Sequence, residues 1–120
     1  MIILDKDITE AEEEIILHGC NMQGKMNSGV AKAIRQKWPH VYEAYMRELP
    51  HRRLGQIIPV RVPAEPGKTN KWVINCLTQQ YYGYDNKPYA DLSAIHSCLL
   101  KVKDMIQYHH IDFSVASVKI

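Results

Sequence analysis

Residues 15–34 have the sequence IILHGCNMQGKMNSGVAKAI, which predicts an apolar strand, a turn rich in small residues and the start of a helix. A helix N-terminus reached through small residues favours anions, because free backbone N–H groups and the positive end of the helix dipole point at the same place. The segment therefore predicts a phosphorylated ligand. The alternative stays open that this junction binds nothing, as in many α/β proteins. The glycine spacing matches neither a P-loop nor the dinucleotide fingerprint.

The composition indicates one domain over residues 1–120. The chain has 15 basic and 13 acidic residues and a formal charge of +2, so we expect no broad nucleic-acid surface. Neither a signal peptide nor a membrane span is visible, which predicts a cytoplasmic protein with no membrane partner. Three cysteines without a Cys-x-x-Cys pair predict buried free thiols, and we expect no metal and no cofactor.

The periodicity of the chain predicts alternating strands and helices. Strands are expected at residues 1–4, 15–20, 56–62, 71–78 and 112–120, and helices at residues 28–38, 41–49 and 89–108. Pro59 cannot donate to a ladder, so its strand should be an edge or carry a bulge. In the last helix, we expect a core stripe of Leu92, Ile95, Leu99, Val102 and Ile106. This order of elements is typical of an α/β sandwich with a mixed sheet.

Several motifs give the chain a family resemblance. Residues 18–21 (HGCN), the glycine-containing turn of residues 24–31, the segment LTQ at 77–79 and YADL at 89–92 together resemble the macro domain family of ADP-ribose-binding proteins. The segments at 77–79 and 89–92 look like the compact branch of the family, which includes phage and microbial proteins similar to ADP-ribose 1''-phosphate phosphatases and small de-ADP-ribosylating hydrolases. The resemblance implies an α/β fold, a three-layer α/β/α sandwich with a mixed central sheet. For a phage protein, the location would be the host-cell cytoplasm.

The resemblance also implies roles for particular residues. Asp7 would accept a hydrogen bond from the adenine amino group, unless it only caps a short helix. Asn21 would hold the distal ribose, unless it only forms the turn after its strand. The implied ligand-binding set is Asp7, Ile8, Cys20, Asn21, Gly24, Lys25, Met26, Asn27, Ser28, Gly29, Val30, Ala31, Thr78 and Gln79. The implied catalytic candidates are His18, Asn21, Gln79 and Asp85.

Three departures from the family pattern leave the function open. Asn27 stands where the family has a glycine, and the sequence stops at Ile120, where a second glycine-rich loop would begin, so the domain is either shortened or reduced. Gln79 replaces the catalytic lysine of some relatives and cannot act as a base. We therefore keep two hypotheses, a hydrolase of ADP-ribose derivatives and a non-catalytic ADP-ribose-binding module. The final strand, 115–120, could also leave an uncovered edge and allow self-association.

Overall fold

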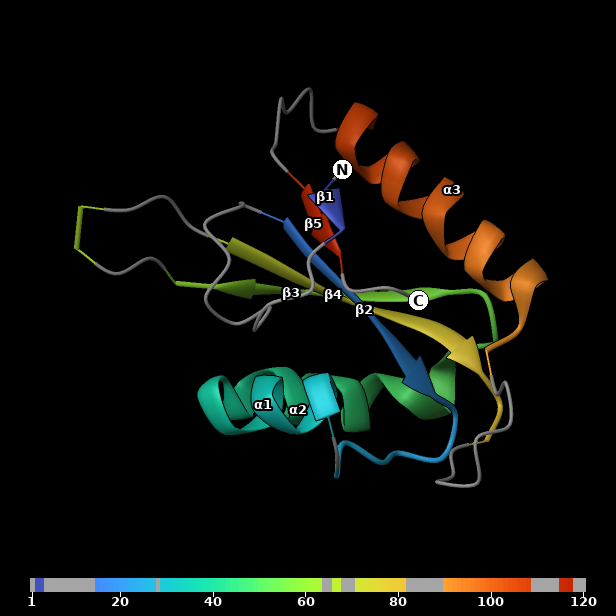
Figure 1. The fold of residues 1–120 in the computed structure, drawn as a ribbon, viewed down its shortest axis with the longest axis horizontal. Coiled ribbons are helices and arrows are strands. Elements are labelled where there is room, and N and C mark those ends of the chain that lie inside the picture. Colours follow the sequence, from blue (N-terminus) through green and yellow to red (C-terminus); the bar gives the residue numbers. More distant parts are fainter. Residues whose placement is uncertain are drawn as a thin grey trace.

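The computed structural model describes residues 2–3, 15–27, 29–63, 66–67, 71–81, 90–108 and 115–117, and the account below concerns these residues (Figure 1). The strands are β1 (Ile2–Ile3), β2 (Ile15–Asn21), β3 (Ile57–Val62), β4 (Lys71–Gln79) and β5 (Val115–Ser117). The helices are α1 (Gly29–Lys37), α2 (Pro39–Glu48) and α3 (Leu92–Tyr108), with a short 3-10 helix η2 (Leu49–His51) after α2. No helix among the described residues is long and apolar enough to span a membrane.

The strands form one mixed sheet in the order β1-β5-β2-β4-β3. All neighbours pair in parallel except β3, which runs antiparallel to β4 and lies at the edge. The predicted edge position of Pro59 is confirmed, because only one side of β3 is paired. The expectation of an uncovered edge at the final strand is wrong for residues 115–117, because β5 pairs with both β1 and β2. β5 therefore offers no unpaired backbone edge for association with another chain.

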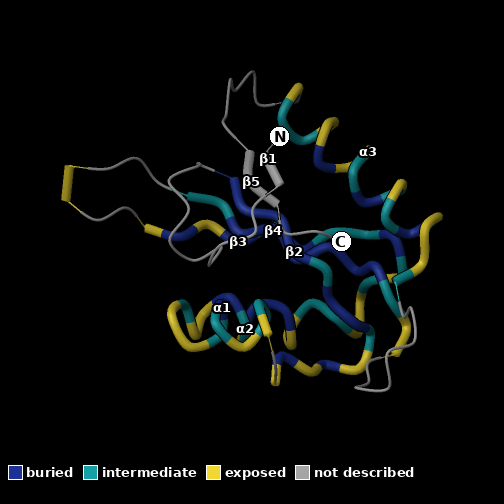
Figure 2. The backbone as a smooth tube through the Cα atoms, in the orientation of Figure 1, coloured by how far each residue is buried: buried dark blue, intermediate teal, exposed yellow. Residues whose placement is uncertain are grey.

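Helices cover both faces of the sheet, which confirms the three-layer α/β/α sandwich (Figure 1). Between the sheet and α1 and α2 lies a core that includes Ile16, Ile34, Val41, Tyr45 and Leu77. A second core between the sheet and α3 consists of Ile15, Leu17, Ile74, Cys76, Cys98 and Val102. Figure 2 shows the central strands as the most continuously buried part of the chain. Because β2 and β4 are buried on both faces, nearly every residue of these strands is apolar or hydrogen-bonded.

The expected α3 core stripe is confirmed in part, because Val102 is buried and Leu99 and Ile106 pack against the second core. Leu92 was expected in the stripe but is 82% exposed. The buried residues of the helix besides Val102 are the smaller Ala94 and Cys98. Asp91 caps α3, since its Oδ1 accepts a hydrogen bond from the Ala94 N–H at 2.9 Å. All three cysteines are free and buried, as predicted.

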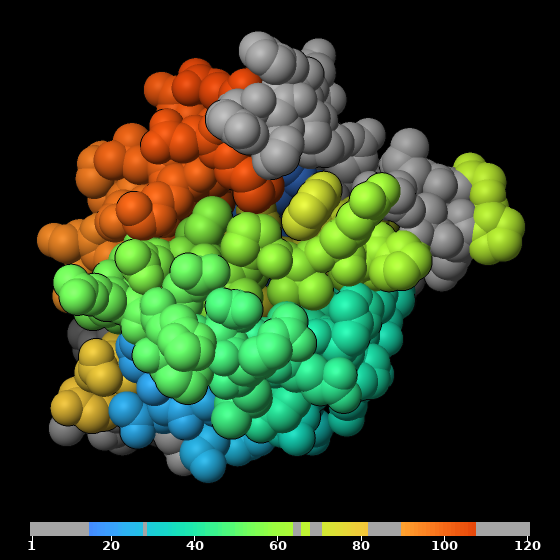
Figure 3. Space-filling model, turned by 180° about the vertical axis from the view of Figure 1, so that it is seen from behind, coloured from blue at the N-terminus to red at the C-terminus, as the bar shows by residue number. Residues whose placement is uncertain are grey.

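Proline residues set the boundary between α1 and α2. The predicted break at Pro39 is confirmed, because α1 ends at Lys37 and Pro39 is the first residue of α2. Pro50 does not end the helical segment, because it lies inside the 3-10 helix η2. Figure 3 shows the segment from α1 to η2 as one continuous surface on the side opposite α3.

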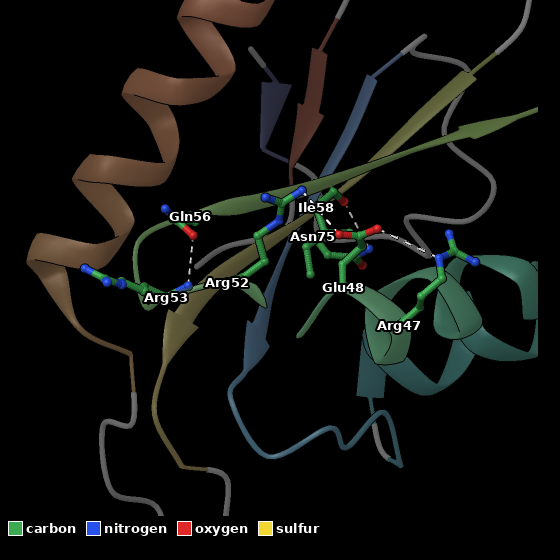
Figure 4. Close-up of polar contacts among 7 residues, drawn as sticks. All are labelled: Arg47, Glu48, Arg52, Arg53, Gln56, Ile58 and Asn75. Carbon is green, nitrogen blue, oxygen red and sulfur yellow. Dashed lines mark hydrogen bonds and ion pairs between the residues drawn. The ribbon is translucent and has the colours of Figure 1, made fainter. Parts of the chain in front are cut away.

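Polar contacts hold the connection between η2 and β3 (Figure 4). Glu48 lies between Arg52, at 3.4 Å, and Arg47, at 3.8 Å, and the Arg53 N–H donates to Oε1 of Gln56 at 2.9 Å. The exposed ion pairs contribute about 1 kcal/mol or less each. Backbone hydrogen bonds between this connection and Leu77 do more to fix its position than the ion pairs, because they attach it to β4.

Candidate functional site

The candidate site lies at the carboxyl ends of β2 and β4. The register shifts between Cys20 and Asn21, so that Asn21 lies opposite Gln79. The Met22 N–H then donates to the carbonyl of Gln79 at 3.0 Å, and the two strands stay joined where β2 turns away from the sheet. In α/β proteins, ligands bind beyond the carboxyl ends of parallel strands, and residues 21–29 leave the sheet at this place.

The side chain of Asn21 organises the turn that follows β2. Its Oδ1 accepts hydrogen bonds from the N–H groups of Gln23, at 2.9 Å, and Lys25, at 3.2 Å. Its Nδ2 donates to the carbonyl of Lys25 at 2.9 Å. This geometry supports the turn-forming alternative for Asn21. The side chain is 7% exposed and keeps a second amide hydrogen, so contact with a ribose stays a prediction.

Tyr45 of α2 connects this turn to the core. Its hydroxyl donates to the carbonyl of Asn21 at 2.5 Å and accepts from the N–H of Gly24 at 3.1 Å. Burial raises the pKa of Tyr45, so the hydroxyl keeps its proton at physiological pH. The sequence predicts a helix at residues 41–49 but does not single out Tyr45. The tyrosine itself was the available signal, because a buried hydroxyl needs a partner.

Two glycines in the left-handed region shape the turn, for different reasons. Gly24 has a φ of 75°, and an added Cβ would lie 3.0 Å from Sδ of Met46. Gly29, the first residue of α1, has a φ of 58° and open space where a Cβ would be. Gly24 therefore permits close packing, whereas Gly29 keeps the approach to the helix N-terminus open. The first turn of α1 leaves backbone N–H groups without intrahelical partners, as anion binding requires.

Other predicted residues of the turn differ in accessibility. Met26 is buried at 1% exposure, so its side chain belongs to the core. Lys25 and Asn27 are exposed, and Oδ1 of Asn27 accepts a hydrogen bond from Nη1 of Arg35 at 3.3 Å. Val30 and Ala31 are half-buried and pack on the first core. Any contact of Met26, Val30 or Ala31 with a diphosphate would therefore come from the backbone.

His18 and Cys20 lie below the site, inside the core. Nε2 of His18 is 2.5 Å from Oδ1 of Asn75, and Sγ of Cys20 is 3.6 Å from the same ring nitrogen. Desolvation by burial lowers the pKa of His18 to about 4 and outweighs the opposing effect of its hydrogen bond to Asn75, and burial raises the pKa of Cys20. His18 is therefore neutral at pH 7 and donates from Nε2. Its 1% exposure argues against the predicted catalytic role.

Asn75 completes this buried polar group. Its Nδ2 donates to the carbonyl of Ile58 at 3.2 Å, so the cluster joins β2, β4 and β3 (Figure 4). The sequence did not single out Asn75, although a polar residue in a strand buried on both faces signals a required partner.

Thr78 and Gln79 end β4 beside Asn21. Thr78 is 1% exposed, and its Oγ1 has no hydrogen-bond partner among the described residues. Its carbonyl accepts from the N–H of Asp91 at 2.7 Å, which anchors the start of α3. Gln79 is half-buried and donates from Nε2 to the carbonyl of Tyr81 at 2.7 Å. A buried hydroxyl without a partner is costly, and a ligand at this edge of the sheet is one way to satisfy it.

The structure thus brings several predicted residues together at one place: Asn21, Gly24, Thr78 and Gln79 lie at the paired strand ends or on the turn after them, whereas the side chain of Cys20 belongs to the core. Four predicted residues, Asp7, Ile8, Ser28 and Asp85, lie outside the described part of the chain. Their roles stay predictions. Together, fold and site define an α/β/α domain with a helix N-terminus and two parallel strand ends at a common edge.

Comparison with known proteins gives the family. The model of the Macro domain matches residues 17–120, and the chain therefore belongs to the Macro domain family. Similar solved structures include the macrodomain of Mycobacterium tuberculosis DarG, at 19% identity and a TM-score of 0.73, covering 98% of this chain and 73% of that one. A macrodomain protein from Streptomyces coelicolor has 26% identity and a TM-score of 0.61, with 94% and 72% covered.

A third similar structure is Thermosipho africanus DarTG in complex with ADP-ribose. It has 15% identity and a TM-score of 0.79, and the alignment covers 96% of this chain but 31% of that one. No curated protein matched the sequence. The expected macro-type fold is confirmed by these likenesses.

Proposed function

We propose that this domain binds ADP-ribose or a derivative of it at the carboxyl ends of β2 and β4. The observation that carries the proposal is the turn after β2, which Asn21 and Tyr45 hold in place and which leads through Gly29 into the N-terminus of α1. Fixed N–H groups at a helix start suit a diphosphate. Membership of the Macro domain family and the ADP-ribose complex of the Thermosipho protein support the same ligand.

Within the proposal, each predicted residue keeps a limited role. The diphosphate would contact the backbone of residues 24–31, and the distal ribose would lie near Asn21 and Thr78. Asp7 and Ile8 would receive the adenine. We place this binding in the cytoplasm.

Binding without turnover is the function that the described residues favour. His18 is buried and neutral, and the carboxamide of Gln79 does not transfer protons. Hydrolysis of an ADP-ribose derivative is the second candidate, and it would depend on Asp85 or on another group beyond the described residues.

Calorimetric titration with ADP-ribose, with AMP as the competing ligand, tests the proposal. We expect ADP-ribose to bind at least about tenfold more tightly, because AMP lacks the second phosphate and the distal ribose. Equal affinities would overturn the assignment. A phosphate-release assay on ADP-ribose 1''-phosphate then separates the two candidates, since a binding module releases none.

A further inference from the structure

A hollow of about 230 Å³ lies beside α1, and its lining residues are Met26, Asn27, Lys32, Arg35 and Gln36. Met26 and Asn27 belong to the turn that the proposed ADP-ribose site uses, whereas Lys32 lies at the end of the first turn of α1 and Arg35 and Gln36 lie on its second turn. No residue of the paired ends of β2 and β4 lines the hollow.

The charged residues that line this hollow are all basic. Residues 15–42 contain no aspartate or glutamate, but they include Lys25, Lys32, Arg35 and Lys37. Within the described part of the chain, neither Lys32 nor Arg35 forms an ion pair with a carboxylate. The lining therefore presents two cations that no described carboxylate pairs with, together with the neutral amides of Asn27 and Gln36.

Arg35 is held in position for a ligand. Its guanidinium carbon lies 3.8 Å from the centre of the Tyr42 ring, and Nη1 donates to Oδ1 of Asn27 at 3.3 Å. A stacked guanidinium loses less side-chain entropy on binding, and its remaining N–H groups match the two oxygens of a carboxylate.

We propose that this hollow binds carboxylate side chains of an acidic polypeptide segment. Nucleic acid fits less well, because single strands need free aromatic faces for base stacking. Here Arg35 covers Tyr42, and Nζ of Lys37 lies 5.3 Å from the centre of the Trp38 ring. A polypeptide is favoured over a small acid, because an open, hydrated hollow holds one anion weakly, whereas linked carboxylates rebind at high local concentration. The inference does not depend on ADP-ribose binding.

The test is an NMR titration of the 15N-labelled full chain with a capped hexaglutamate peptide. We expect saturable shifts centred on the backbone amides of Asn27, Lys32, Arg35 and Gln36, weakening as salt is added. The Lys32→Gln, Arg35→Gln double variant should bind at least about fivefold more weakly. The matched control is Lys101→Gln, Lys103→Gln on α3, which removes the same charge from the opposite side of the sheet and should change the affinity less than about twofold.

Three results would overturn the proposal. The first is an equal loss of affinity in the α3 control, which would mean attraction by net charge alone. The second is tighter binding of a hexanucleotide than of hexaglutamate at the same salt concentration. The third is an equal response to glutarate at a matched carboxylate concentration, which would assign the hollow to small acids. Lys32→Gln alone leaves the Arg35 to Tyr42 contact intact, so it keeps the test valid if the double variant is unstable.

Discussion

The hydroxyl of Tyr45 donates a hydrogen bond to the backbone carbonyl of Asn21, which is 24 residues earlier in the chain. The same hydroxyl accepts from the N–H of Gly24, so one side chain of α2 satisfies two backbone groups of the turn after β2. The shape of the candidate ligand site therefore depends on a residue that lies behind it.

Tyr45→Phe should loosen this turn without removing a residue of the ligand-facing surface. Two buried backbone groups lose their partner, so we expect the free energy of unfolding to fall by about 1–3 kcal/mol. Affinity for ADP-ribose should fall as well, because the N–H groups of the turn are no longer fixed. Urea unfolding and calorimetry measure the two effects. Tyr42→Phe is the control, since its ring can still stack on Arg35, and full affinity in Tyr45→Phe would contradict this account.

Stability should fall as the solution is acidified, through His18. The folded chain protonates His18 only near pH 4, whereas an unfolded histidine is protonated below about 6.5. Between these two pH values the unfolded state binds more protons than the folded state. Acidification therefore lowers the free energy of the unfolded state relative to that of the folded state. From pH 7 to pH 5 this contributes a loss of about 2 kcal/mol. Measured by urea unfolding across this range, the free energy of unfolding should depend less on pH in His18→Gln than in the unmodified chain. An unchanged pH dependence would mean that another group titrates.

The two left-handed glycines should respond differently to alanine. Gly29→Ala meets no neighbouring atom and should cost about 1 kcal/mol from backbone strain alone. Gly24→Ala adds a contact at 3.0 Å with Met46 to a similar strain and should cost about 2 kcal/mol or more. Thermal melting compares them. Gly29→Glu should keep the fold and abolish ADP-ribose binding, and collapse of that variant would instead make Gly29 a structural glycine.

Thr78→Val separates a structural hydroxyl from a ligand-binding one. The substitution removes a buried Oγ1 without a partner and conserves the shape, so the free protein should gain up to about 1 kcal/mol of stability. ADP-ribose affinity should fall about fivefold if the hydroxyl binds the ligand. Unchanged affinity with raised stability would exclude Thr78 from the site. Calorimetry and melting on the same sample give both values.

Local patterns predicted the features that depend on neighbouring residues. The apolar run of residues 71–78 predicted β4, Pro39 the break between α1 and α2, and Pro59 an edge strand. In the core stripe of α3, Val102 was predicted correctly but Leu92 was not, because hydrophobicity alone ranks Leu92 above Ala94 and cannot show that the helix buries Ala94 instead.

Long-range pairs account for most of what the sequence missed at the site. Tyr45 contacts Asn21, and Asn75 contacts His18 across 57 residues, so neither contact leaves a local pattern. His18 was a catalytic candidate through the family resemblance. Both faces of β2 are buried, and the His18 side chain lies inside the core against Asn75.

The strand order has a consequence for the time course of folding. Among the strands that the structure describes, β1 pairs with β5 alone, and Ile2 lies opposite Ala116. During synthesis, the beginning of the chain therefore has no partner in the sheet until its far end has been made. β2, β3 and β4 lie closer together in sequence and can assemble earlier, so closing the loop between Ile2 and Ala116 is the contact with the greatest entropic cost and the natural last step.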